Sequence, residues 1–184
     1  MTAAVVLAAG ASTRLGEPKQ LVILNGETLL ERAVRTAREA DLSPVIVIVK
    51  DATLIETIQA QGAQVLLNRK FYQGMSTSIH AGVRWAGGLK ADGVVLMTCD
   101  QPAVTAGHLM ELCAEPALIA GSGYAGKVGI PAYFPSSRFG ELMKLDGDVG
   151  ARALLHGARA VNCEALALDI DTEDDLKRAR ELFG

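Results

Sequence analysis

Apolar runs and amphipathic stretches alternate along the first half of the chain. Runs that are rich in apolar residues without regular polar alternation, as in strands covered on both faces, lie at residues 3–8, 45–49, 64–68 and 94–97. Two of the stretches between them open with the spacing of a capping box, Thr28 with Glu31 and Thr53 with Glu56. This order predicts an α/β fold in which right-handed crossovers join a mostly parallel sheet covered on both faces.

The next elements are marked by hydroxyl residues. Ser76 or Ser78 is expected to begin one helix, and Thr105 is expected to begin another. From Ala117 the pattern changes, because residues 118–134, LIAGSGYAGKVGIPAYF, are rich in glycine and contain only short β-like pieces.

The last third of the chain returns to regular patterns. Residues 142–155 are expected to be helical with an interruption near residues 146–150, and residues 166–171 are expected to form the last strand. Thr172 precedes a C-terminal helix with acidic residues in its first turn. The length of 184 residues and the lack of a repeat or linker predict one domain over residues 1–184.

Composition excludes several classes of function. A net charge of −3 with scattered basic residues argues against a nucleic-acid partner. No apolar stretch reaches the roughly 18 residues of a membrane helix, and the first residues do not resemble a secretory leader. The three cysteines, Cys99, Cys113 and Cys163, do not suit a disulfide framework, so we expect a cytoplasmic protein without a membrane partner.

The loop after the first strand reads LAAGASTRLGEPKQL at residues 7–21. It matches neither the dinucleotide fingerprint nor the P-loop, so it predicts a looser phosphate cradle. Gly10 allows close backbone approach, Ser12 and Thr13 offer donors, Arg14 can bind phosphate oxygens bidentately, and Lys19 supplies a point charge. The alternative is a solvated turn with ordinary surface cations, and composition alone does not separate the two.

Two further loops follow predicted strands. In TCDQP, Asp100 is a natural magnesium ligand at the mouth of a buried strand, whereas its alternative role as a turn former is weakened because Thr105 is the better cap. In NRKFYQGMSTS, Asn68 can read a base edge through its amide, although a plain turn and helix cap explain this loop equally well. The three histidines lack metal-ligand spacing, so they are interpreted as structural or solvated: His80, His108 and His156.

Six segments, in order from residue 7 to residue 176, together resemble the MobA-like nucleotidyltransferases related to molybdenum cofactor cytidylyltransferase. They are LAAGASTRLGEPKQL, NRKFYQGMSTSIHAGV, TCDQP, GKVGIPAYF, LDGDVGARALL and DIDTEDDL. The resemblance implies a Rossmann-like three-layer αβα sandwich of the nucleotide-diphospho-sugar transferase type. It also implies transfer of CMP from CTP to a phosphate-bearing acceptor, molybdopterin carrying molybdenum, with release of pyrophosphate.

The resemblance assigns roles to individual residues. Catalytic roles fall to Arg14, Lys19 and Asp100, and Mg²⁺ is expected at Asp100, with Asp171 approaching it from the last strand. The alternative for Asp171 is that it only forms the turn before the Thr172 cap. An acceptor phosphate needs no general base, so these groups would position the reactants and neutralise charge. The residues expected to bind the nucleotide are Leu7, Ala8, Ala9, Gly10, Ser12, Thr13, Arg14, Lys19, Asn68, Gly74 and Ser76.

Ala9 bears on the choice of base. The related guanylyltransferases have a second glycine here, giving LAGG, whereas this chain has LAAG as in the cytidylyltransferases. A β-carbon at this point would crowd a purine, so the sequence favours CTP over GTP.

On the acceptor side, Asp148 is expected to cap a helix that carries Arg152. The guanidinium of Arg152 can bind a phosphate or a pterin carbonyl of the acceptor, and Lys127 can add a second positive charge. The alternative is that Asp148 only caps and that Arg152 pairs with a surface acid. Ile130 departs from the family pattern, in which histidine often precedes the proline.

Other functions remain open at this stage. They are a guanylyltransferase or another nucleotidyltransferase with a different acceptor, an NAD(P)H-linked oxidoreductase of the same fold, and a carrier of the molybdenum cofactor. A molybdoenzyme or its maturation factor is the expected protein partner.

Overall fold

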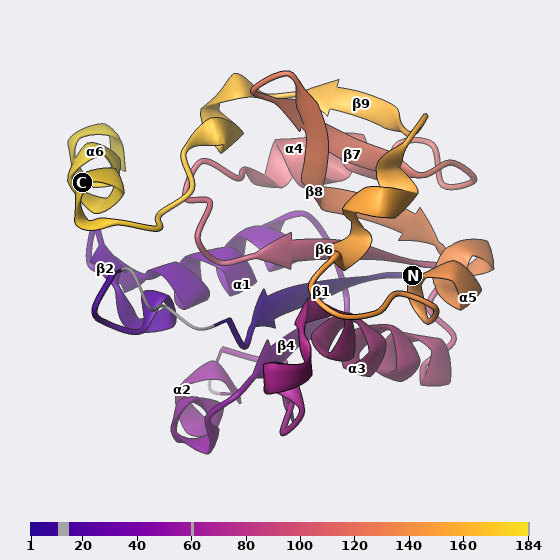
Figure 1. Ribbon diagram of the computed structural model, residues 1–184, viewed down its shortest axis with the longest axis horizontal. Helices are drawn as coiled ribbons and strands as arrows, with labels where there is room; N and C mark the ends of the chain where they lie inside the picture. The colour runs from indigo at the N-terminus through magenta and orange to yellow at the C-terminus, as the bar shows by residue number, and fades with distance from the viewer. Residues whose placement is uncertain (11–14, 60, 184) are drawn as a thin grey trace.

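The computed structural model describes residues 1–10, 15–59 and 61–183, and it has a central sheet with helices on both faces (Figure 1). In these residues the main sheet has the strand order β5-β4-β1-β6-β8-β7-β9, and β8 alone runs antiparallel to its neighbours. This confirms the mostly parallel α/β fold. The strands are β1 (Thr2–Ala8), β4 (Val45–Val49), β5 (Gln64–Leu67), β6 (Gly93–Thr98), β7 (Ala120–Tyr124), β8 (Lys127–Pro135) and β9 (Arg159–Asn162), and a separate small ribbon pairs β2 (Ile23–Leu24) with β3 (Glu27–Thr28).

Different helices cover the two faces of the sheet. Alternate side chains of β1 point to opposite faces, so Val6 packs in the cluster with α1, α2, α4 and α6, while Val5 packs with α3, α5 and the turn η5. The result is the expected three-layer sandwich. The helices are α1 (Leu29–Glu39), α2 (Ile55–Gln59), α3 (Met75–Gly88), α4 (Ala106–Leu112), α5 (Phe139–Leu142) and α6 (Glu173–Phe183), and the 3-10 turns are η1 (Lys19–Leu21), η2 (Ala52–Leu54), η3 (Phe71–Gln73), η4 (Ser136–Arg138), η5 (Gly150–Leu155) and η6 (Glu164–Ala167). None of the described helices is long and apolar enough to cross a membrane.

Three of the predicted helix caps are present. Thr28 forms a full capping box with Glu31, because each side chain accepts a hydrogen bond from the other residue's backbone N–H. Thr105 and Thr172 likewise accept from the backbone N–H three residues later, at 3.2 Å in both cases. The cap predicted at Thr53 is wrong, because Asp51 accepts a hydrogen bond from Thr53 N at 2.9 Å and caps η2.

Three other expectations about elements are corrected. Helix α3 begins at Met75 behind Gly74, rather than at Ser76 or Ser78. Helix α5 ends at Leu142, Gly147 and Gly150 have positive φ angles in the expected interruption, and only the 3-10 turn η5 follows instead of a resumed helix.

The segment 166–171 is not a strand. The edge of the sheet is instead taken by β9, which pairs with β7, and η6 follows it. The chain then crosses to the end of β6, where Ile170 N donates a hydrogen bond to the carbonyl oxygen of Asp100 at 2.9 Å. A second bond, from the side-chain amide of Gln101 to the carbonyl oxygen of Leu166 at 3.1 Å, also joins this segment to the loop after β6, so its acidic tail lies beside that loop.

Candidate active site

Three charged side chains from distant parts of the sequence meet at the carboxyl ends of the parallel strands. The ammonium group of Lys19, at the start of η1, lies 3.1 Å from Oδ2 of Asp100 and also pairs with Oδ1 of Asp171. Asp100 stands two residues after the end of β6, and β1 leads into the opening loop beside it. Ligands of open α/β sheets bind at this edge, so the structure brings together three of the predicted site residues where a site is expected.

The electrostatics of this group keep the lysine charged. All three side chains are partly buried. Burial of the ammonium group acts to lower the pKa of Lys19, but the carboxylates of Asp100 and Asp171 outweigh it and raise that pKa above its usual value. Lys19 is therefore a fixed cation at neutral pH.

Asp169 belongs to the same acidic group, although the sequence interpretation missed it. It is partly open to solvent, yet desolvation of its carboxyl group and the negative charge of Asp100 raise its pKa to about 7. The signal was present in the sequence, because residues two apart in an extended segment point to the same side, and Asp169 and Asp171 have that spacing.

The oxygen atoms at this site suit a divalent cation. Oδ1 of Asp100 is buried and accepts no hydrogen bond from the described residues, so the carboxylate keeps an unused lone pair. Carboxylates are hard ligands of the kind that Mg²⁺ and Mn²⁺ prefer. The described residues contain no group of three or more His, Cys, Asp or Glu side chains arranged as a complete metal centre. This fits magnesium, which commonly uses one or two carboxylates and takes its other ligands from water and phosphates.

A cleft of about 350 Å³ lies next to this group of charges. Of the residues expected to bind nucleotide, four line it: Leu7, Ala9, Gly10 and Gly74. Asp100 lines it as well, whereas Ala8 is buried with its carbonyl oxygen accepting from the side-chain amide of Gln20. Ser12, Thr13 and Arg14 lie outside the described residues.

Asn68 and Ser76, like Ala8 and Lys19, are expected nucleotide ligands that do not line this cleft. The buried amide nitrogen of Asn68 donates to the hydroxyls of Thr77 and Ser78, both at 2.9 Å, and its oxygen accepts from the backbone N–H of Lys70 at 2.9 Å. Both amide hydrogens of Asn68 thus fix the loop before α3. Asn68 and Ser76 instead line a separate hollow, whereas Ser78 lines the cleft.

The acceptor residues predicted from the sequence are spread over three elements. Asp148 lines the cleft, but it does not cap the turn that follows it: its carboxylate accepts a hydrogen bond from Met75 N at 3.2 Å and so caps α3. Lys127 lies over the ring of Tyr124, with Nζ 5.2 Å from the ring centroid. Arg152 is exposed on η5.

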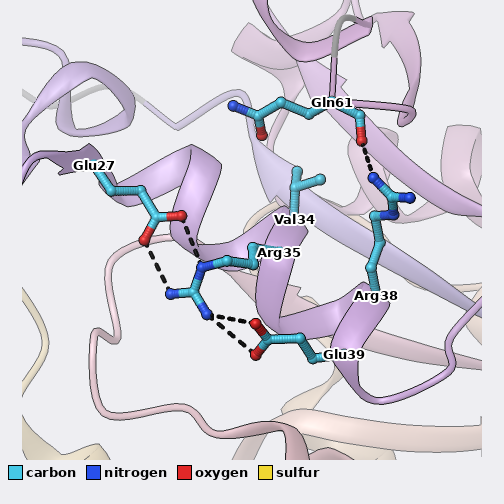
Figure 2. A pocket seen from close by; sticks show the side chains of 6 residues that line it. All are labelled: Glu27, Val34, Arg35, Arg38, Glu39 and Gln61. Carbon is cyan, nitrogen blue, oxygen red and sulfur yellow. Dashed lines mark hydrogen bonds and ion pairs between the residues drawn. The ribbon is translucent and has the colours of Figure 1, made fainter.

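Another hollow, with a volume of about 500 Å³, lies against α1 (Figure 2). Its charged groups bind one another. Arg35 donates to both Glu27 and Glu39, which raises the pKa of Arg35, and its hydrogen bond lowers the pKa of Glu27. Arg38 donates to the backbone carbonyl of Gln61. Because these charges are satisfied internally, this hollow is not the candidate site.

Comparisons with known proteins agree with the geometry. The profile of the MobA-like NTP transferase domain matches residues 4–163. The purine catabolism protein PucB of Bacillus subtilis is 33% identical, with 98% of this chain and 96% of that protein covered. A probable molybdenum cofactor guanylyltransferase of Opitutus terrae is 29% identical over 60% of this chain and 55% of that protein.

A solved structure shows the same likeness. The crystal structure of Rv0371c from Mycobacterium tuberculosis is 33% identical, covers 98% of this chain and 97% of its own, and superposes with a TM-score of 0.82. Another structure of Rv0371c is a complex with manganese. The resemblance found in the sequence is confirmed: the chain belongs to the MobA-like NTP transferase family of nucleotidyltransferases.

Proposed function

We propose that this protein transfers CMP from CTP to the phosphate group of a molybdopterin-type acceptor and releases pyrophosphate, with Mg²⁺ as the metal. The observation that carries the proposal is the group formed by Lys19, Asp100 and Asp171, of which Asp100 lines a cleft together with residues Ala9 and Gly10 of the loop after β1. A nucleotidyltransferase needs cations and a metal site at the triphosphate and an open cleft for the remainder of its substrates.

The reaction follows from the charges. An oxygen of the acceptor phosphate attacks the α-phosphorus of CTP, the bond from that phosphorus to the oxygen that bridges to the β-phosphorus breaks, and pyrophosphate leaves with that electron pair. A phosphate monoester is largely ionised at neutral pH, so no side chain has to remove a proton. Bound between Asp100 and Asp171, Mg²⁺ would neutralise phosphate charge. Lys19 supplies a further cation for phosphate oxygens, and the backbone at Ala9 and Gly10 offers N–H groups.

Ala9 supports CTP as the nucleotide. It lines the cleft and is 6% exposed, so its β-carbon occupies space that a glycine would leave open to a larger base. GTP is the second candidate, because two relatives are named probable molybdenum cofactor guanylyltransferases. Those names also support molybdopterin as the acceptor, and a molybdoenzyme or its maturation factor remains the proposed protein partner. The free cysteines suit the reducing cytoplasm, which we propose as the location.

The direct test is pyrophosphate release with ATP, CTP, GTP and UTP, each with and without molybdopterin. We expect release only when a nucleotide and molybdopterin are both present, and we expect the highest kcat/KM with CTP. A preference for GTP would replace the cytidylyl assignment, and no release with any nucleotide would overturn the transfer reaction. NADPH oxidation in the same samples tests the oxidoreductase alternative.

The acceptor side is tested separately with Arg152→Ala. If Arg152 binds the acceptor, its removal raises the apparent KM for molybdopterin while calorimetric CTP affinity stays unchanged. Arg138→Ala is the matched control, because Arg138 is another partly exposed arginine and pairs with Glu141 away from the cleft. Unchanged acceptor saturation in Arg152→Ala would leave this arginine with a surface role only.

A further inference from the structure

Large apolar side chains are exposed at one wall of the cleft, where a purely anionic ligand would not need them. Phe71, Tyr72 and Met75 all line the cleft, and Tyr72 is 72% exposed although it carries an aromatic ring. All three come from one five-residue stretch, the turn η3 and the first residue of α3. The lining of the cleft thus combines the carboxylates of Asp100 and Asp148 with the exposed rings of η3.

The stretch that carries these side chains is firmly held. Gly74 has φ 109°, and a β-carbon there would lie 2.4 Å from the backbone carbon of Gly147, so the two loops touch directly. Ser76 N donates to the carbonyl oxygen of Gly147 at 3.1 Å, and Asp148 accepts from Met75 N. The exposed rings therefore project from backbone that is fixed before any ligand arrives, which lowers the entropic cost of binding.

The two rings differ in what surrounds them. They pack edge to face, with centroids 6.1 Å apart and an interplanar angle of 82°. The ammonium group of Lys50 lies 5.8 Å from the centroid of Phe71, so Phe71 is engaged on two sides. Tyr72 keeps most of its surface open, and Phe71 supports it from the side.

We propose that Tyr72, supported by Phe71, is a stacking surface for a planar nitrogen heterocycle bound in this cleft. A ligand that carries both phosphates and a flat ring matches a cleft lined by Gly10, Asp100 and the rings of η3. Aromatic side chains bind such rings with little dependence on ring identity. The inference rests on the proposed function, and it adds Tyr72 as a residue that binds one of the two substrates. Both substrates contain such a ring, which is the base in the nucleotide and the pterin in the acceptor.

A fluorescent reporter separates these two sources. Trp85 is the one tryptophan of the chain, and it lines a separate hollow on α3 with Arg84 and Leu89. The double variant Trp85→Phe with Tyr72→Trp therefore has a single indole, placed at the proposed stacking position. CTP, GTP, molybdopterin and inorganic tripolyphosphate are added one at a time, and fluorescence is followed.

Each outcome bears on the proposal. Quenching by a nucleotide alone assigns the base, and quenching by molybdopterin alone assigns the acceptor ring. Tripolyphosphate has no ring and is expected to leave the signal unchanged. No quenching by any of the ring-bearing probes, or equal quenching by tripolyphosphate, would overturn the stacking role.

Affinity supplies the second readout. Tyr72→Ala is expected to weaken binding of the assigned ligand about tenfold by calorimetry, equivalent to ~1.4 kcal/mol, whereas Tyr72→Phe keeps the ring and stays within about twofold. Leu182→Ala, on the exposed side of α6, is the control for loss of a surface apolar side chain. Pyrophosphate release by the wild-type protein tests the proposed function independently: release together with unaltered ligand affinity in Tyr72→Ala refutes the stacking role alone.

Discussion

The ammonium group of Lys19 lies 3.1 Å from Oδ2 of Asp100 and also pairs with Asp171, so the lysine sits between the two carboxylates proposed to hold the metal. A divalent cation and an ammonium group would compete for the same negative charge. Triphosphate oxygens offer Lys19 another partner. We therefore expect this arrangement to couple binding of metal to binding of nucleotide, because a nucleotide that draws Lys19 away would leave both carboxylates to the metal.

Lys19→Met is expected to separate the two roles of this lysine. Without nucleotide, the variant should bind Mn²⁺ about tenfold more tightly than the wild type, because the competing cation is gone. Turnover should nevertheless fall by ~10²-fold, because a preorganised charge at the phosphates is lost. Electron paramagnetic resonance of free Mn²⁺ measures the first effect, and pyrophosphate release measures the second.

The matched control is Lys127→Met, which removes a lysine that lies over Tyr124 and outside the group of acids. It should leave Mn²⁺ affinity unchanged. Equal or weaker Mn²⁺ binding by Lys19→Met would show that Lys19 does not compete with the metal.

Asp100→Asn is expected to lower transfer by at least ~10²-fold at saturating Mg²⁺ while the protein stays folded. The amide has nearly the same shape as the carboxylate, but it lacks the charge that a hard cation requires. Circular dichroism and thermal unfolding verify the fold, and pyrophosphate release gives the rate. Near-normal turnover would show that Asp100 is not a metal ligand needed for transfer.

The parts that the sequence predicts well are those that depend on neighbours in the chain. The capping box of Thr28 and Glu31 is a local contact, and the apolar run at residues 45–49 forms β4 because a strand buried on both faces needs no polar positions. The fold class follows from the order of such segments. The patterns of strands and helices are therefore sufficient to predict a layered α/β sheet.

Errors arise where contacts between distant segments decide the outcome. Asp148 was expected to cap its own turn, but it caps α3, whose first residue is 73 positions earlier in the sequence. No local pattern contains that contact. Asn68 differs, because its amide hydrogens bind hydroxyls of α3 only nine and ten residues later, in keeping with the turn-and-cap alternative that the sequence left open for this loop. Only the family resemblance predicts that Asp100 and Asp171 act together. The two residues are far apart in the sequence, and both contact Lys19 in the folded chain.

Ala9→Gly is expected to relax the choice between CTP and GTP. Removing the β-carbon widens the cleft beside the base, so the ratio of kcat/KM for CTP to that for GTP should fall about tenfold. Steady-state kinetics with both nucleotides measures the ratio. Ala8→Gly is the neighbouring control, because Ala8 is buried and does not line the cleft. A wild-type enzyme that prefers GTP, or an unchanged ratio in Ala9→Gly, would contradict the steric argument.

Asp148→Ala is expected to destabilise the protein by ~1 kcal/mol, because Met75 N at the start of α3 loses its cap. Asp148→Asn should keep most of that stability, since an amide oxygen also accepts the hydrogen bond. Urea unfolding followed by circular dichroism gives the free energies. If Asp148 also contacts the acceptor, Asp148→Asn should change the acceptor KM at nearly unchanged stability, so the pair of variants separates the two roles.

His108 is expected to make the free energy of unfolding depend on pH. It is buried, and its Nε2 lies 2.7 Å from the hydroxyl of Ser122; because that hydroxyl donates to the carbonyl oxygen of Pro131, Nε2–H is the donor to Ser122. Burial lowers the pKa of His108 below its usual value near 6.5, although the charge of Glu111 opposes this.

Because the folded-state pKa lies below the unfolded value, the unfolded chain binds the proton first as the pH falls. The contribution of His108 is therefore constant above about pH 7, and below about pH 6.5 the free energy of unfolding decreases by up to ~1.4 kcal/mol per pH unit, until the folded protein also takes up the proton. His108→Gln, whose amide N–H can replace Nε2–H, should remove this slope. Urea unfolding of the wild type and the variant from pH 5 to pH 8 measures the difference, with His156→Gln as the control at an exposed histidine. Parallel curves for the wild type and His108→Gln would show that His108 does not change protonation on unfolding in this range.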